Sequence, residues 1–155
     1  DRAENAMIVD LLRNDLSKVC ECHSVDVPSF CKLESYANVH HLVSTVTGEL
    51  KKGKTPIDLL EATMPGGSIS GAPKIRAMEI IDEMEDLRRG PYCGAMGYIG
   101  FNGNMDMNIL IRTIIYTEEK ATFFSGGAIT ADSKPEAEYQ ETLDKASKII
   151  ESFSS

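Results

Sequence analysis

Apolar residues recur at two spacings along this chain, and the spacings separate helices from strands. Spacings of three and four residues are typical of amphipathic helices, and they occur over 4–14, 56–63, 72–87 and 135–153. Alternating or β-branched runs predict short strands over 19–22, 24–27, 30–36, 40–47, 93–101, 105–117 and 121–131. Asn102-Gly103-Asn104 is typical of a hairpin turn, and strands joined by tight turns are antiparallel. The pattern therefore predicts an α+β fold, with antiparallel sheet flanked by helices.

One arginine interrupts the predicted strand 105–117. If the side chains alternate, Arg112 shares a face with Leu110 and Ile114. A charge on an apolar face is costly without a partner, and a guanidinium suits a carboxylate or a phosphate. Two interpretations stay open: an internal ion pair with an Asp or Glu, or a bound anionic ligand.

Composition narrows the classes of function. The chain has 155 residues, 42% of them hydrophobic, which is enough for the core of one domain. A formal charge of -8 disfavours nucleic acid as a partner. No apolar run reaches the ~20 residues of a membrane helix, so we expect no membrane partner. The cysteines Cys20, Cys22, Cys31 and Cys93 are interpreted as reduced thiols of a cytoplasmic protein rather than as zinc ligands.

The segment 48–55, Gly-Glu-Leu-Lys-Lys-Gly-Lys-Thr, matches the phosphate-binding pattern G-x-x-x-x-G-K-[ST]. Its context argues against a nucleotide-binding module. Pro56 removes a backbone donor at the start of the following helix, and the neighbouring strands are predicted to be antiparallel, whereas this motif belongs to parallel sheets. The favoured interpretation is a charged surface loop, with the nucleotide site as the alternative.

Acidic residues on two predicted helices are candidate metal ligands. Glu4 lies at the head of the first helix, and Glu138, Glu141 and Lys145 share one face of the last. Carboxylates from two helices are suitable ligands for Mg²⁺. The alternative is a solvated helix face, because these residues lie roughly opposite the apolar stripe of the last helix.

Three further features are compatible with a ligand site. The glycine-rich loop 65–71 carries Ser68 and precedes a helix, whose free N–H groups attract anions. Gly126 and its neighbour Gly127 follow an aromatic run, where a ligand could approach the backbone closely. His41 is a candidate acid or base. For each feature the alternative is structural: a turn, a bulge and an ordinary histidine.

Taken together, these segments resemble the chorismate-utilising enzymes. The resemblance rests on four stretches in the same order as in the family: 1–15, 40–45, 65–83 and 126–142. The wording Pro-Gly-Gly-Ser at 65–68 is similar to that of the aminodeoxychorismate synthase branch, whereas the anthranilate synthase branch usually has Ala-Gly-Thr there. The isochorismate and salicylate synthases of the same family are further alternatives.

The resemblance implies a role for each candidate residue. Glu4 and Glu141 would bind Mg²⁺, with Glu138 close by. Tyr92 and Arg112 would bind the enolpyruvyl carboxylate of chorismate, and the backbone of Gly126 would contact the same region. The remaining implied roles are substrate binding by Ser68, charge balance beside the metal by Lys145, and an active-site histidine at His41.

The implied reaction replaces the C4 hydroxyl of chorismate with ammonia from a glutamine amidotransferase subunit, for folate synthesis. The family fold is about twice this length or more, with two antiparallel sheets, so residues 1–155 would be the C-terminal portion of one chorismate-binding domain. The branch's upstream Pro-Ile-Lys-Gly-Thr segment, with its nucleophilic lysine, is not in this sequence. The resemblance therefore implies that the isolated chain is inactive. It also implies exposed sheet edges and apolar surface, hence self-association.

Overall fold

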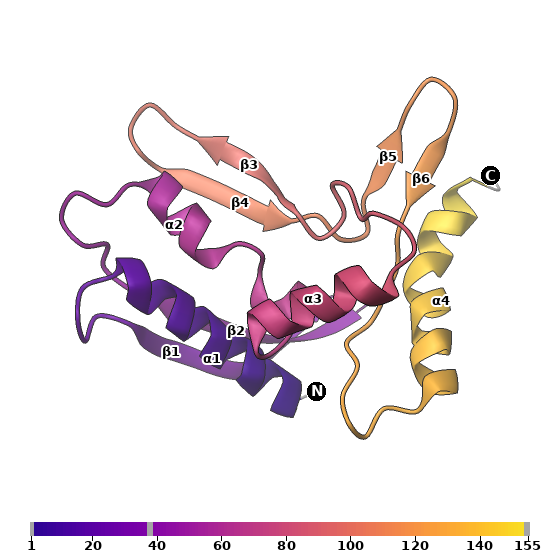
Figure 1. Ribbon diagram of the computed structural model, residues 1–155, viewed down its shortest axis with the longest axis horizontal. Coiled ribbons are helices and arrows are strands. Elements are labelled where there is room, and N and C mark those ends of the chain that lie inside the picture. The colour runs from indigo at the N-terminus through magenta and orange to yellow at the C-terminus, as the bar shows by residue number, and fades with distance from the viewer. Residues whose placement is uncertain (1, 37–38, 154–155) are drawn as a thin grey trace. The chain divides into compact units, whose positions relative to one another are not determined.

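Helices and antiparallel hairpins alternate in the computed structural model, which describes residues 2–36 and 39–153 and confirms the α+β class (Figure 1). The elements in chain order are α1 (Arg2–Val19), β1 (Asp26–Tyr36), β2 (Val39–Thr47), α2 (Pro56–Thr63), the 3-10 helix η1 (Gly67–Ile69), α3 (Lys74–Met84), β3 (Ala95–Ile99), β4 (Met105–Ile109), β5 (Ile114–Tyr116), β6 (Ala121–Phe123) and α4 (Pro135–Ser152). In the part of the chain described, consecutive strands pair as β1–β2, β3–β4 and β5–β6. No helix in that part is long and apolar enough to cross a membrane.

The chain divides into two compact units. The first comprises Asp1–Asp86 and Tyr98–Asp106, and the second comprises Leu87–Gly97 and Met107–Ser155. Each unit is described by itself below. Asp1, which opens the first stretch of the family resemblance, lies outside the described residues.

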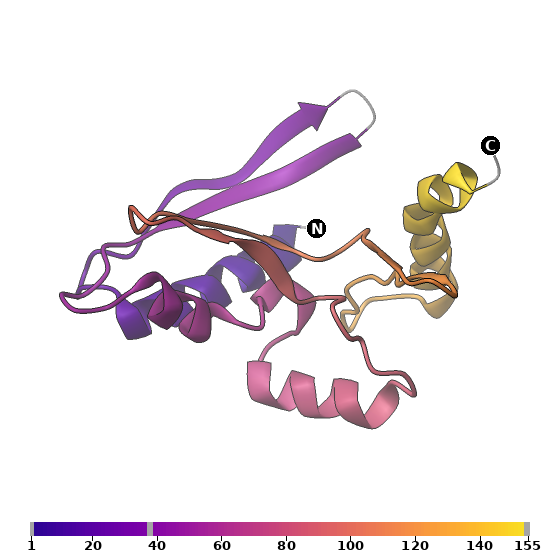
Figure 2. The same cartoon turned by 90° about the horizontal axis from the view of Figure 1, so that it is seen from above.

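In the first unit, α1 packs along the β1–β2 hairpin, as the view from above shows (Figure 2). The contact is made by the side chain of Asn5. Its Nδ2 donates to the carbonyl of Leu42 at 3.1 Å, and its Oδ1 accepts from Ser44 Oγ at 2.5 Å and from Cys31 Sγ at 3.3 Å. One amide therefore joins the start of the helix to both strands of the hairpin.

The first helix is longer than predicted, and the strand expected at 19–22 is wrong. The strand expected at 24–27 is confirmed only from Asp26, where it forms the start of β1. The apolar spacing from Val9 continues through Leu16 to Val19, and both valines are buried at 6% exposure, so the helix extends to Val19. Cys20 then forms an isolated antiparallel bridge with Leu50, and the chain turns at His23, which has a φ of 65°.

The predicted strand 105–117 is interrupted, which overturns the expectation that Arg112 lies on a strand face. The chain turns between β4 and β5, where Arg112 adopts a φ of 51° and is exposed. The break follows from local pairing: Leu110 exchanges backbone hydrogen bonds with Cys93 and Gly94, at 3.0 and 2.9 Å, and the Ile111 amide then donates to Ile109. The last strand likewise ends at Phe123 rather than at 131.

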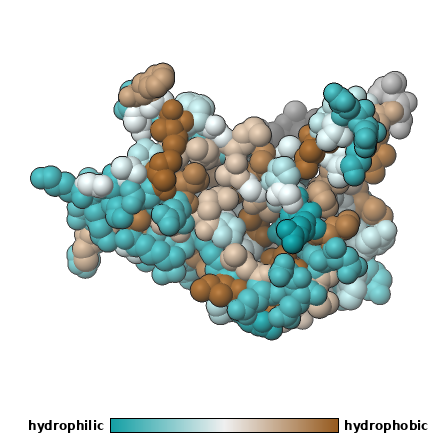
Figure 3. Space-filling view, turned by 45° about the horizontal axis from the view of Figure 1, so that its top comes forward, coloured by the Kyte–Doolittle hydropathy of each residue, from teal (hydrophilic) through white to brown (hydrophobic). Residues whose placement is uncertain are grey.

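Large apolar side chains remain exposed on several elements. Ile75 and Met84 on α3 are 76% and 75% exposed, and in the predicted apolar stripe of α4 only Ala146 is buried. Hydrophobic side chains reach the surface on the face drawn in Figure 3. The exposed apolar surface agrees with the expectation from the sequence, and self-association stays a prediction.

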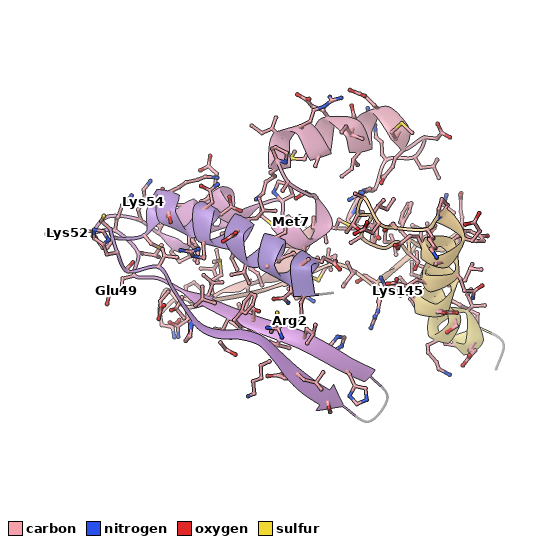
Figure 4. The ribbon with its side chains drawn as sticks, turned by 90° about the horizontal axis from the view of Figure 1, so that it is seen from below. Arg2, Met7, Glu49, Lys52, Lys54 and Lys145 are labelled. Carbon is pink, nitrogen blue, oxygen red and sulfur yellow. The ribbon has the colours of Figure 1, made fainter. Side chains whose placement is uncertain are left out.

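The phosphate-binding-like segment forms a helix cap. Asp58 accepts hydrogen bonds from Lys54 Nζ at 2.8 Å and from the Thr55 amide at 2.9 Å, while its own amide donates to Thr55 Oγ1 at 3.4 Å. This is a capping box at the start of α2, with Pro56 in the first helical turn. The lysine and threonine of the pattern are thus engaged with the helix that follows them. Figure 4 shows Lys54, Lys52 and Glu49 at the same end of the first unit.

We predict that the capping box makes the chain more sensitive to acid. The hydrogen bond from Lys54, followed by those from Thr55, holds the pKa of Asp58 well below its ordinary value of 3.8. Because the folded pKa lies below the unfolded one, this contribution to stability is present above about pH 4 and declines as the pH falls further. Asp58→Asn should flatten the decrease of the thermal midpoint between about pH 5 and pH 2. Glu61→Gln, on the same helix but outside the box, should leave that decrease unchanged; parallel curves for Asp58→Asn and the parent chain would refute the assignment.

Candidate active site

The second unit brings the ring of Tyr92 against the backbone at Gly126. The ring stacks on Phe124, with centroids 5.4 Å apart and an angle of 17° between the planes. The Arg89 guanidinium lies over the Tyr92 ring as well, 5.8 Å from its centroid. A Cβ added at Gly126 would lie 3.1 Å from the Tyr92 hydroxyl oxygen, tighter than most real contacts. Glycine at this position therefore allows the hydroxyl to sit against the backbone.

The acidic face of α4 meets the same glycine-rich segment. Lys145 Nζ lies 2.6 Å from Glu141 Oε1 and 3.4 Å from the carbonyl oxygen of Gly126. A Cβ added at Gly127 would meet Glu138 Oε2 at 3.5 Å and Lys145 Nζ at 3.6 Å. Lys145 on α4 is labelled in Figure 4. The sequence left open whether this helix face is solvated. In the structure it packs beside Gly126 and Gly127, which have no side chains.

Hydroxyl groups fix this arrangement. Ser133 Oγ donates to Glu138 Oε1 at 2.5 Å, which orients the carboxylate. Ser125 Oγ donates to the carbonyl of Thr142 at 2.8 Å, which ties the chain after β6 to α4. These contacts explain why the predicted strand 121–131 ends early: the segment leaves the hairpin to follow the helix.

Arg112 belongs to the second unit but lies in the bend between β4 and β5. Its guanidinium makes no hydrogen bond or ion pair with the residues that the structure describes. The internal ion pair considered from the sequence is therefore not seen there, and binding of an anionic ligand remains an expectation.

The first unit carries the other three candidates. Glu4 lies in the first turn of α1 and is half-buried. His41 lies on β2 in register with Glu34 of β1, with its ring exposed. Asn5 follows Glu4 and Leu42 follows His41 in the sequence. The hydrogen bond from the Asn5 side chain to the Leu42 carbonyl therefore joins α1 to β2 beside these two candidates. Ser68 is exposed on η1.

The donor chemistry suits magnesium, although no complete metal centre forms among the described residues. Glu138 and Glu141 offer carboxylate oxygens one turn apart, the ligand type that Mg²⁺ prefers alongside water. Within the described ranges, no three His, Cys, Asp or Glu side chains are grouped to hold a metal. The four cysteines form no disulfide among the described residues, and burial raises the pKa of the Cys20 thiol.

Several residues that shape the site were missed by sequence reasoning. Arg89, Phe124 and Ser125 position Tyr92 and α4, but no spacing in the sequence connects them to those elements. Asn5 was part of a motif segment without a role of its own. Asp15, buried at 1% exposure, had a weak signal: an acid in a helix whose neighbouring positions are apolar.

Comparison with known proteins identifies the family. The family of chorismate binding enzymes matches residues 1–151. Aminodeoxychorismate synthase component 1 of Escherichia coli (strain K12) is 54% identical over 97% of this chain, and the match covers 33% of that protein. Anthranilate synthase component 1 of Aquifex aeolicus is 49% identical over 99% of this chain, covering 31% of that protein. The chain thus spans about a third of the length of these relatives.

A solved structure supports the fold. Anthranilate synthase component I from Streptococcus pneumoniae superposes with a TM-score of 0.85 at 47% identity, covering 93% of this chain and 33% of that one.

We predict that Ser125 links the glycine-rich segment to α4 energetically. Ser125→Ala should lower the free energy of unfolding by about 1 kcal/mol, because a half-buried carbonyl loses its donor. Ser147→Ala is the matched control: its hydroxyl bonds only to the Asp144 carbonyl within the exposed surface of α4. That variant should stay within about 0.5 kcal/mol of the parent chain in denaturant unfolding. Equal effects from both substitutions would show that the link contributes nothing specific.

Proposed function

Because the chain belongs to the chorismate binding enzymes, we propose that it forms part of an aminodeoxychorismate synthase. In this proposal the complete domain replaces the C4 hydroxyl of chorismate with ammonia, giving 4-amino-4-deoxychorismate for folate synthesis. The relative at 54% identity, an aminodeoxychorismate synthase component 1, favours this branch. The free cysteines are compatible with a cytoplasmic location.

One observation carries the proposal. Three candidates nominated by the family resemblance, Tyr92, Gly126 and Lys145, come from separate segments and converge in the second unit. The Lys145 ammonium and the Tyr92 hydroxyl both lie beside the backbone of Gly126. A cation, a bare backbone and a phenol placed together suit a small carboxylate-bearing substrate.

Each residue would contribute by position. Tyr92, whose ring contacts both Phe124 and Arg89, would donate its hydroxyl to a substrate carboxylate without losing ring freedom on binding. Arg112 would add a guanidinium to the same carboxylate, since no described partner engages it. Lys145, paired with Glu141, would balance the acidic charge of α4.

Glu138 and Glu141 of the second unit are proposed as magnesium ligands, and the family resemblance nominates Glu4 for the same role. Bound Mg²⁺ would supply electrostatic stabilisation at the ring carboxylate and favour departure of the C4 hydroxyl. The residues around these carboxylates prepare them: Ser133 orients Glu138, and Lys145 lowers the cost of keeping acidic groups close together on α4.

Ammonia would come from a glutamine amidotransferase subunit, as the resemblance implies. The rest of the domain would cover the apolar faces that the chain exposes on α3 and α4. Self-association of the isolated chain would follow from the same exposed surface.

Anthranilate synthase is the second candidate, favoured by the relative at 49% identity and by the superposed structure. The products separate the two. A chorismate-binding domain containing this chain, supplied with chorismate, ammonium and Mg²⁺, should form 4-amino-4-deoxychorismate. Accumulation of anthranilate instead would move the chain to the other branch.

We predict that Glu141→Gln in such a complete domain lowers the amination rate on the order of 100-fold and raises the Mg²⁺ concentration needed for half-maximal rate. Glu136→Gln is the matched control, because Glu136 is exposed in the first turn of the same helix. It should leave both quantities unchanged. Equal rates for Glu141→Gln and the parent domain would remove Glu141 from the metal site.

We also predict that the isolated 155-residue chain does not convert chorismate, with ammonia as the nitrogen source. A measurable rate from the purified chain would contradict this. Thermal unfolding adds a binding readout, since a ligand that binds only the folded state raises the midpoint. A Mg²⁺-dependent shift with chorismate would place ligand contacts within this chain, whereas a shift with ATP and Mg²⁺ alone would favour the nucleotide alternative at 48–55.

A further inference from the structure

A buried ion pair joins the start of α3 to α1. Asp15 is 1% exposed, and it is the one buried charged residue in the described part of the chain. Its carboxylate contacts Lys18 Nζ at 2.8 Å and also contacts Lys74 Nζ. Lys18 belongs to the same helix as Asp15, and its side chain is 54% exposed. Lys74 lies 59 residues after Asp15 in the sequence, and its side chain is only 16% exposed.

The position of Lys74 is not explained by the helix that it begins. It is the first residue of α3, and Pro73 before it provides no side-chain cap. The N-terminus of a helix carries partial positive charge, so a lysine there is unfavourable for the helix itself. Its pairing with Asp15 therefore indicates a role between elements rather than within α3.

A second contact fixes the loop before α3 to the same helix face. A Cβ added at Gly67 would lie 2.9 Å from Leu11 Cβ, so the backbone of η1 rests directly on α1. Leu11 and Asp15 are four residues apart and share one helix face. Glu4 lies on that face too, because at 100° per residue positions 11 and 15 each fall within about 20° of position 4, on either side of it.

The loop between these anchors carries Ser68. Inside it, the Ile69 amide and the Ser70 hydroxyl both donate to the carbonyl of Gly66, at 3.2 and 2.9 Å. These two bonds are internal to the loop. Its attachment to α1 comes from the Gly67–Leu11 contact and from the Lys74–Asp15 ion pair.

We propose that Lys74 and Asp15 are positioning residues that hold the Ser68 loop on the Glu4-bearing face of α1. The significance of that geometry for substrate rests on the proposed function, in which Ser68 and Glu4 both serve chorismate. The attachment itself is a property of the first unit and is tested without any ligand.

The test compares amide hydrogen exchange in three forms of this chain. In Lys74→Met, exchange of the Ile69 amide should rise about tenfold or more, because the loop opens when one attachment is lost. The Met64 and Lys51 amides, which donate to the carbonyls of Leu60 and Val19, should be unchanged. Lys18→Met is the matched control: it removes the other cation from Asp15 and should leave Ile69 at the parent rate.

Two results would overturn the proposal: a uniform rise at all three amides, which would mean a general loss of stability, or no rise at Ile69. Should Lys74→Met fail to fold, Asp15→Asn combined with Lys74→Met removes the buried carboxylate charge together with its partner, and the same comparison of amides decides. A complete domain that fails to aminate chorismate would count against the proposed function and leave the exchange result unaffected.

Discussion

The side-chain amide of Asn5 is the interaction on which the first unit depends. It uses both its oxygen and its nitrogen to bind β1 and β2, and thereby sets the angle and height at which α1 meets the hairpin. A half-buried polar group with satisfied partners specifies one arrangement, because any slip of the helix would leave donors and acceptors unpaired. Everything attached to α1, including the loop with Ser68, takes its place from this contact.

Charges complement that arrangement at the other end of the helix. Removing Asp15 from water is costly, and a single exposed lysine would not compensate for it. Lys74 supplies the second, more buried cation from a distant segment. An ion pair of this kind contributes little net stability compared with apolar packing, but its geometry is demanding. Its value therefore lies in defining where α3 begins relative to α1.

Local pattern predicted the elements whose signals lie within one segment. The helix 56–63 was placed to the residue, because its capping threonine and first-turn proline are local features. The hairpin at Asn102-Gly103-Asn104 was predicted for the same reason. The break at Arg112 in the predicted strand 105–117 was not foreseen, because it depends on backbone hydrogen bonds between Leu110 and the distant residues Cys93 and Gly94. The alternation of apolar and polar residues within a strand does not show where the segment that pairs with it ends.

The candidate site shows the same division. Glu138, Glu141 and Lys145 share a helix face by spacing alone, and the structure places that face beside the Gly126 segment. Phe124, Ser125 and Ser133 hold Tyr92, α4 and Glu138 in place through contacts between segments, and the spacing of residues in the sequence does not predict such contacts. Apolar stripes on α3 and α4 were recognised, but a stripe does not say what covers it.

The capping box at Thr55 has a consequence for how short motifs are used. Glycine, lysine and threonine at the required spacing satisfy a nucleotide-binding pattern letter by letter, yet the aspartate three residues beyond the match accepts hydrogen bonds from the side chains of both Lys54 and Thr55. A search for the eight-residue pattern 48–55 does not include Asp58, which is the eleventh residue counted from Gly48. Including the first helical turn after such a match, and asking whether an acid stands there to occupy the lysine, would separate genuine phosphate loops from helix caps in other sequences.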